Sequence, residues 1–416
     1  MTNYETWTQD RTLNSYATNH GSRPIAYQGW QKFKEAFSPE VVERAISANP
    51  VPARHIYDPF GGSGTTALTA QFLGVKPITG EVNPYLADVI RAKLQHYDIR
   101  KLEVDAMSFL SQCETILEPE NERSLPATFI EPGVKTRWLF AKSTGDFLLA
   151  CVELARGFTD EHARLFKVAI GGTLVDLSNA RVSGKGRRYR SNWKARESTI
   201  SDALNSVQAA LRRIIEEIRS HNDRQESSSI VLEGSVLDTI KAVESFDLAV
   251  LSPPYPNSFD YTDVYNIELW MLGYLNNYEE NRRLREATLT SHVQIHRDYR
   301  IAPSSAILEQ TLERIEERTE KLWNQNIPSM LGAYFEEMRL VLAGIYSPLT
   351  AGGDVWLVVG DSSYAGVRVE VGRILAEIAN SLDFEVVESQ VLRRMTAAPQ
   401  QADNLGLAES LLRLRK

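Results

Sequence analysis

The segment from His55 to Leu94 constrains the fold most, because short apolar stretches alternate in it with helical ones around a glycine-rich turn. HIYDPF (55–60) predicts a strand that runs into the turn, and TTALTAQFLG (65–74) predicts a helix closed by glycine. A second strand and a second helix follow in VKPITGEVNP (75–84) and YLADVIRAKL (85–94). This alternation predicts a doubly wound α/β fold.

The alternation resumes after a long interruption. SSIVLEGS (228–235) and FDLAVLSPPY (246–255) predict two more strands, the second apolar enough to be buried on both faces. A helix in 334–349, a strand in 352–362, a helix in 369–382 and a closing pair of strands follow. The interruption is mainly helical and shows no repeat. We therefore predict a first half-sheet in 1–97, an inserted domain in 98–227 and a second half-sheet in 228–416.

Composition excludes several classes of protein. With 43% hydrophobic and 24% charged residues the chain is globular, and no stretch approaches about 18 uncharged apolar residues. The polar N-terminus does not resemble a signal peptide. Cys113 and Cys151 form neither a disulfide framework nor a zinc cluster, as expected of a reducing compartment. We expect a cytoplasmic protein with no membrane partner.

The net charge of −8 argues against a nucleic-acid partner, but the charge is unevenly distributed. The run RVSGKGRRYRSNWKAR (181–196) holds seven basic residues and no acidic one, with Tyr189 and Trp193 as possible stacking surfaces. Alone it would predict only a solvated loop. Together with the motifs below it predicts DNA contacts by Arg181, Lys185, Arg187, Arg188, Arg190, Lys194 and Arg196.

The turn DPFGGSGTT (58–66) places three glycines and several hydroxyls between a strand and a helix N-terminus. Backbone N–H groups and the helix dipole there favour an anionic ligand group such as a carboxylate. No lysine follows the last glycine, so the turn is not a phosphate-binding loop of the Walker type. Glu81, at the end of the next strand, stands where an acidic side chain accepts hydrogen bonds from ribose hydroxyls.

The tetrapeptide SPPY (252–255) ends a buried strand, where ligands of open α/β sheets bind. Its two prolines fix the backbone and leave carbonyls free to accept hydrogen bonds. An aromatic amine is a poor nucleophile, and acceptors for its two protons favour a pyramidal, attacking nitrogen. Ser252 Oγ and the Pro253 carbonyl can be those acceptors, while the ring of Tyr255 can stack on a base rotated out of a duplex.

Together the two motifs resemble the signatures of the DNA amino-methyltransferases, a DPFxGxGTT-like turn and a [DNS]PP[YF] tetrapeptide. Segments 27–42 and 334–416 also resemble that family. The resemblance implies a Rossmann-like class I methyltransferase sheet with a mainly helical insertion, and S-adenosylmethionine as cofactor. It implies cofactor contacts at Lys32, Phe33, Asp58, Phe60, Gly62, Gly64, Thr65, Thr66, Glu81 and Ser235, and catalysis by Ser252, Pro253, Pro254 and Tyr255.

The sequence departs from that family in two places. Ser235 stands where an acidic residue is usual, which leaves Glu233 or Asp238 as substitutes. The insertion precedes the third strand instead of following it, so 257–270 and 291–300 are alternative DNA-facing segments. His292 and His296 lack a third metal ligand, and we expect flexible polar residues there and no metal site.

Family members with serine first in the tetrapeptide tend to methylate the cytosine amine. The resemblance therefore predicts direct in-line methyl transfer to the exocyclic amino nitrogen of cytosine in double-stranded DNA, and a cognate restriction system is a candidate partner. Adenine, an RNA base amine and an inactive nucleic-acid-binding homologue remain alternatives. Ring-carbon methylation is disfavoured, because neither cysteine lies in the proline-preceded context that such enzymes use.

Overall fold

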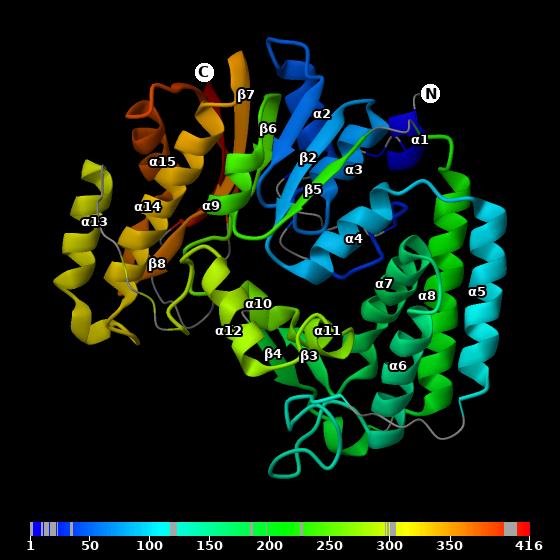
Figure 1. The fold of residues 1–416 in the computed structure, drawn as a ribbon. Coiled ribbons are helices and arrows are strands. Elements are labelled where there is room, and N and C mark those ends of the chain that lie inside the picture. The colour runs from blue at the N-terminus through cyan, green and yellow to red at the C-terminus, as the bar shows by residue number, and fades with distance from the viewer. Residues whose placement is uncertain are drawn as a thin grey trace.

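A seven-stranded sheet forms the centre of the computed structural model, in the order β10-β11-β7-β6-β1-β2-β5 (Figure 1). The model describes residues 3–9, 11, 16, 22, 24–33, 36–116, 123–183, 186–196, 198–224, 228–295, 297, 299, 305–394 and 406–416. The parallel strands are β1 (His55–Asp58), β2 (Lys76–Glu81), β5 (Ile230–Glu233), β6 (Phe246–Leu251) and β7 (Leu349–Gly360). The closing antiparallel pair is β10 (Glu385–Arg394) and β11 (Ala408–Arg415).

Helices cover both faces of the sheet, which confirms the predicted α/β class. Alternate residues of β6 show this, because Ala249 and Leu251 pack into one core and Leu248 and Val250 into the other. The first face is covered by α9 (Val236–Thr239), α13 (Ala306–Glu316), α14 (Ile327–Tyr346) and α15 (Val371–Asn380). The second is covered by α2 (Pro39–Ala48) and α3 (Thr65–Phe72), with α4 (Pro84–Leu94) beside α3.

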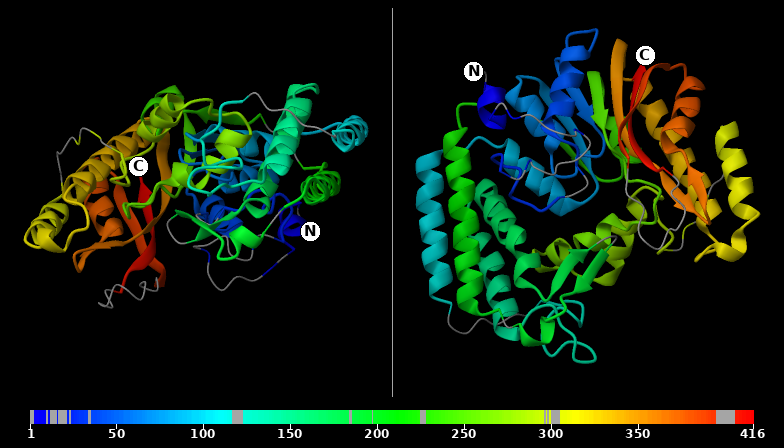
Figure 2. Two further views of the ribbon diagram at one scale, coloured as in Figure 1. Left: turned by 90° about the horizontal axis from the view of Figure 1, so that it is seen from below. Right: turned by 180° about the vertical axis from the view of Figure 1, so that it is seen from behind.

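Residues 98–227 carry four long helices, α5 (Ile99–Glu114), α6 (Lys142–Ala155), α7 (Asp160–Leu177) and α8 (Ile200–Ser220). Figure 1 and Figure 2 show them as a group at one side of the sheet, beside α4. Tyr85 of α4 is buried against α7, where a Cβ on Gly171 would lie 2.5 Å from the Tyr85 hydroxyl. Buried residues of α3, α4 and α5 to α8 form one hydrophobic core, so these helices extend the core of the first half-sheet.

A further group of elements lies on the side of the sheet where the carboxyl ends of the parallel strands are found (Figure 1). They are α10 (Tyr261–Val264), α11 (Asn266–Met271), α12 (Tyr278–Ala287) and the hairpin β3 (Ala180–Ser183) to β4 (Gly186–Tyr189). Figure 1 shows the hairpin beside α10 to α12, and α10 contacts β4. Apart from these the described chain contains α1 (Asn3–Thr8), β8 (Ser362–Tyr364), β9 (Val367–Val369) and three short 3-10 turns. Within the described ranges, no helix combines the length and apolarity that a membrane crossing requires.

Candidate active site

One cavity of about 350 Å³ lies at the carboxyl ends of β1, β2 and β6. Both sequence motifs contribute to its wall, although the whole insertion separates them in sequence. The predicted cofactor positions that line it are Phe33, Asp58, Phe60, Gly62, Thr65, Thr66 and Glu81, and all four residues of the tetrapeptide line it as well. The cavity falls within the size range of small-molecule and cofactor sites.

The glycine turn holds one end of this cavity in a fixed shape. Asp58 Oδ1 accepts a hydrogen bond from the backbone N–H of Phe60 at 2.9 Å. Gly62 has φ +53°, and a Cβ there would lie 2.7 Å from the ring of Phe33, so a side chain would both strain the turn and collide. Thr65 begins α3, and among the described residues its buried hydroxyl has no hydrogen-bond partner. An unsatisfied buried hydroxyl beside a helix N-terminus suits an anionic or polar ligand group.

Glu81 joins the end of β2 to the glycine turn. Its Oε2 accepts from the backbone N–H of Gly62 at 2.7 Å, and its Oε1 accepts from that of Asn83 at 2.8 Å. Burial raises the pKa of Glu81 to about 7 and that of Asp58 to about 6, and hydrogen bonds partly oppose both shifts. This end of the cavity therefore changes its charge near neutral pH.

The tetrapeptide forms the other end, and a distant strand holds its tyrosine. The hydroxyl of Tyr255 donates to Glu409 Oε1 at 2.6 Å, and Glu409 Oε2 accepts from Arg393 Nε at 2.5 Å. Ser252 Oγ lies 3.5 Å from the same hydroxyl. Burial and the carboxylate of Glu409 hold the pKa of Tyr255 well above the ordinary value of a phenol, so the ring is neutral and its O–H is a donor. Glu409 and Arg393 line the cavity, and the sequence reasoning missed both.

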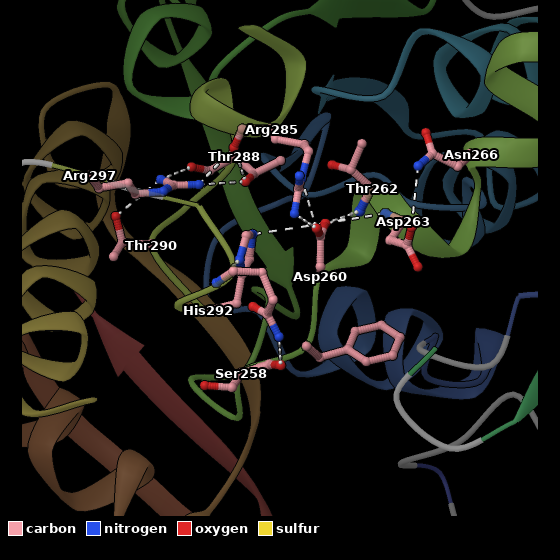
Figure 3. Close-up of polar contacts among 12 residues, drawn as sticks. Ser258, Asp260, Thr262, Asp263, Asn266, Arg285, Thr288, Thr290, His292 and Arg297 are labelled. Carbon is pink, nitrogen blue, oxygen red and sulfur yellow. Dashed lines mark hydrogen bonds and ion pairs between the residues drawn. The ribbon is translucent and has the colours of Figure 1, made fainter. Parts of the chain in front are cut away.

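A network around Asp260 supports the cavity wall formed by Ala287 to His292 (Figure 3). Asp260 Oδ1 accepts from the backbone N–H groups of Thr262 and Asp263 and so caps α10. Its Oδ2 accepts from Arg285 Nε at 2.8 Å. The carboxylate therefore fixes the start of α10 and the end of α12 to each other.

The same wall is held from its outer side by Arg297 (Figure 3). The guanidinium donates to the carbonyl of Thr288 at 2.8 Å and to the hydroxyl of Thr290 at 3.1 Å. Thr290 also donates twice to Glu337 of α14, from its backbone N–H at 2.6 Å and from its hydroxyl at 2.7 Å. These bonds tie the wall to the helical layer on the sheet.

His292 was expected to be a flexible polar residue, and this was wrong. It is 1% exposed, it lines the cavity, and its Nε2 lies 3.8 Å from Asp260 Oδ1. Desolvation lowers the pKa of His292 to about 4, so the imidazole is neutral at physiological pH. His296 lies outside the described residues, within which no three His, Cys, Asp or Glu side chains are grouped as metal ligands.

Three predicted cofactor positions are absent from the lining of the main cavity. Lys32 pairs with Asp176 and lines a second cavity of about 260 Å³ instead. Gly64, at the start of α3, has φ +83°, and it lies against Ile90 of α4. Ser235 caps α9 between two residues that do line the main cavity.

The suggested substitutes for an acidic residue at 235 are also absent from that lining. Glu233 pairs with Arg91 at 2.9 Å, and Asp238 pairs with Lys241 at 3.0 Å.

The basic run was expected to be a loop, but its described part forms the β3–β4 hairpin and a 3-10 turn at 193–195. Arg187 pairs with Asp263 at 3.2 Å, and Arg190 donates to the carbonyls of Ser178 and Val175. Arg196 donates to the carbonyl of Asp176. The exposed basic residues of the run are Arg181, Arg188 and Lys194, and Lys185 lies outside the described residues.

The alternative DNA-facing segment 257–270 contributes to both the core and the cavity. Ile267, Leu269 and Trp270 are buried in the core that α5 to α8 share. Tyr261 and Tyr265 line the main cavity, and the ring of Tyr265 stacks on that of Phe33 with centroids 5.9 Å apart. This segment therefore links the tetrapeptide end to the glycine-turn end.

Strand order, glycine turn and cavity position together define an α/β Rossmann-like methyltransferase fold. The chain is similar to the Type II methyltransferase M.BsoBI of Geobacillus stearothermophilus, with 25% identity over 94% of this chain and 84% of that protein. It is similar to the Type II methyltransferase M.AvaI of Nostoc sp., with 24% identity over 87% of this chain and 80% of that protein.

A third relative is similar over a shorter stretch. The Type II methyltransferase M.MjaII of Methanocaldococcus jannaschii is 32% identical over 20% of this chain and 16% of its own length. No protein-family model matches the chain. The solved rRNA methyltransferase aviRa of Streptomyces viridochromogenes aligns with 91% of this chain and 85% of its own at a TM-score of 0.31 and 10% identity, too low a likeness to bear on function.

Proposed function

We propose that the chain is an S-adenosylmethionine-dependent DNA methyltransferase that modifies the exocyclic amino nitrogen of cytosine. The observation that carries this proposal is the single cavity in which the glycine turn and the SPPY tetrapeptide meet. Near full-length similarity to proteins named Type II methyltransferases supports the reaction class. The serine at 252 supports cytosine, through the resemblance of the tetrapeptide to that family.

The glycine-turn end suits the cofactor. S-adenosylmethionine supplies an electrophilic methyl group on a sulfonium. The N-terminus of α3 and the unsatisfied hydroxyl of Thr65 suit its carboxylate. Glu81 has one hydrogen bond on each carboxylate oxygen and keeps lone pairs for ribose hydroxyls. Phe33 and Phe60 supply apolar wall.

The tetrapeptide end suits a base amine. Ser252 Oγ and the Pro253 carbonyl accept hydrogen bonds from the two N–H groups of the amine, which orients the nitrogen lone pair toward the turn end of the cavity. The ring of Tyr255 holds the plane of a base rotated out of the duplex. Nothing in this scheme requires a covalent bond between chain and base, because alignment of amine and methyl group supplies the catalysis.

The proposed partner is double-stranded DNA, contacted by the exposed basic residues of the hairpin. Replacing Arg181, Arg188 and Lys194 together with alanine should weaken DNA binding and make it less salt-dependent by a slope of about 0.9 per lost phosphate contact. Arg187→Ala is the matched control, because that side chain is already paired with Asp263. Fluorescence anisotropy at several salt concentrations measures both, and an unchanged slope in the triple variant would place DNA elsewhere.

The experiment that tests the reaction uses purified protein, tritiated S-adenosylmethionine and duplex DNA, followed by digestion to nucleosides and chromatography with mass detection. Label in N4-methylcytosine is the expected result. Label in adenine would keep the mechanism and correct the base. Label in RNA alone, or in neither nucleic acid, would overturn the proposal.

A further inference from the structure

Three residues form a row across the closing strands of the sheet. Arg393 of β10 faces Glu409 of β11, and Glu409 faces Gly360 of β7. Side chains of directly opposed residues lie on the same face of a sheet. The side chains of Arg393 and Glu409 are therefore neighbours, and beside them Gly360 leaves an open space because it has no side chain. Of the two side chains, Glu409 is only 4% exposed.

The ring of Tyr255 occupies the place that a side chain at 360 would take. A Cβ on Gly360 would lie 2.5 Å from Cε2 of that ring and 2.7 Å from its Cδ2. From this position the hydroxyl reaches Glu409 at 2.6 Å, and Glu409 reaches Arg393 at 2.5 Å. The row of polar contacts therefore runs from Arg393 through Glu409 to Tyr255, which follows β6 in the chain.

The tyrosine backbone is fixed separately. Pro253 and Pro254 restrict the chain before it, and its own N–H donates to the hydroxyl of Tyr261 at 3.3 Å. Backbone restriction leaves the side-chain torsions free, and the contact with Gly360 together with the bond to Glu409 restricts those. Holding a ring in one orientation removes an entropic cost that base binding would otherwise carry.

We propose that Glu409 is a positioning residue, which acts on the flipped base by orienting the ring of Tyr255. Arg393 holds the carboxylate, and Gly360 supplies the space for the ring. This inference rests on the proposed function, because it assigns the ring to the target base. It adds to the site a residue that reaches it only through strand register, far from either sequence motif.

A double-variant cycle of Glu409→Ala and Tyr255→Phe tests the role. Each single variant should lower kcat about tenfold and leave S-adenosylmethionine affinity unchanged, because only the orientation of the ring is lost. The combined variant should be no worse than either, since both remove the same bond. Glu409→Gln keeps an acceptor and should restore kcat to within about threefold of the wild type.

Two controls separate positioning from a general effect on the fold. Glu388→Ala changes a carboxylate of the same hairpin that faces Arg413, and it should leave kcat unchanged. Gly360→Ala should lower kcat with Glu409 intact, whereas Gly372→Ala should not, because its added Cβ would lie 3.7 Å from its nearest neighbour. Losses that multiply in the double variant, or no rescue by glutamine, would overturn the proposal.

Failure of the proposed function is distinguished by a readout that needs no activity. If the wild type methylates no DNA, thermal unfolding of the same four proteins still measures the coupling between Tyr255 and Glu409. If the two substitutions are coupled in thermal unfolding but the wild type transfers no methyl group, the contact between Tyr255 and Glu409 would be supported and the role of the ring toward a base would be refuted. If the effects of the two substitutions on unfolding are additive, the contact between Tyr255 and Glu409 itself would be refuted.

Discussion

The two ends of the main cavity are built in different ways. At the glycine turn the polar contacts stay within residues 58–83, because Asp58 bonds to Phe60 and Glu81 bonds to Asn83 and to Gly62. At the tetrapeptide the contacts cross the fold, as between Tyr255 and Glu409. The polar contacts of the first end therefore lie within one strand–turn–helix–strand unit, and those of the second depend on the assembly of the whole sheet.

The two ends also differ in electrostatics. Burial raises the pKa values of Asp58 and Glu81 to about 6 and 7, so the turn end titrates around neutrality. At the other end Tyr255 stays protonated, and the pKa of His292 is lowered to about 4 by desolvation. The charge of the proposed cofactor end should thus change around neutral pH, while Tyr255 and His292 at the proposed base end stay neutral.

The largest expected effect comes from the tetrapeptide end. Tyr255→Ala should lower single-turnover methyl transfer about 100-fold or more, because the base loses the surface that orients it, with S-adenosylmethionine affinity within about threefold. Ser252→Ala should also lower single-turnover methyl transfer, because the base amine loses one hydrogen-bond acceptor. Rapid-quench kinetics and calorimetry measure the two quantities on the same protein.

Phe33→Ala is the matched aromatic change at the other end. Phe33 contacts the turn at Gly62, so its loss should weaken S-adenosylmethionine binding about tenfold and spare transfer at saturation. If both variants lowered affinity and transfer alike, the assignment of separate roles to the two ends would fail.

This difference also explains what the sequence predicted. The strands of the two half-sheets, the glycine turn and the tetrapeptide follow local rules of periodicity and glycine placement, and the structure has strands and a turn where the sequence predicts them. Glu409 could not be predicted as a site residue, because only the register of β11 against β7 and β10 brings it to Tyr255. His292 was misjudged because its burial depends on the fold: it is 1% exposed, and its ring lies 3.8 Å from the carboxylate of Asp260, which is distant in sequence. Lys32 resembles a family element, yet the structure pairs it with Asp176.

A pH titration sharpens the comparison at the turn end. The ionised carboxylate of Glu81 is the form that accepts hydroxyl hydrogen bonds, so cofactor affinity should rise about tenfold between pH 6 and 8 as the group ionises around pH 7. Glu81→Gln should remove most of that rise, and calorimetry in matched buffers measures it. A wild-type affinity that is flat across this range would contradict the shifted pKa.

The same shift predicts a stability effect of opposite direction. Because the folded pKa is raised above the ordinary value of 4.5, the neutral carboxyl of Glu81 contributes stability that is complete below pH 4.5. That contribution is lost as pH rises through about 7. The thermal midpoint of the ligand-free wild type should therefore fall, relative to Glu81→Gln, between pH 5 and 8.

The smallest expected effect concerns the wall around the base end. Asp260→Asn keeps an oxygen that can cap α10 but loses the charge that faces Arg285, in a position where the carboxylate is 7% exposed. Leaving Arg285 without its charged acceptor should destabilise the fold by about 1–3 kcal/mol and lower transfer only a few-fold, because the tetrapeptide itself is untouched. Asp263→Asn breaks a pair whose carboxylate is 43% exposed, and it should cost less than about 1 kcal/mol. Urea unfolding of both variants measures the contrast. Equal losses would mean that burial of the pair between Asp260 and Arg285 gives this wall no more stability than an exposed pair does.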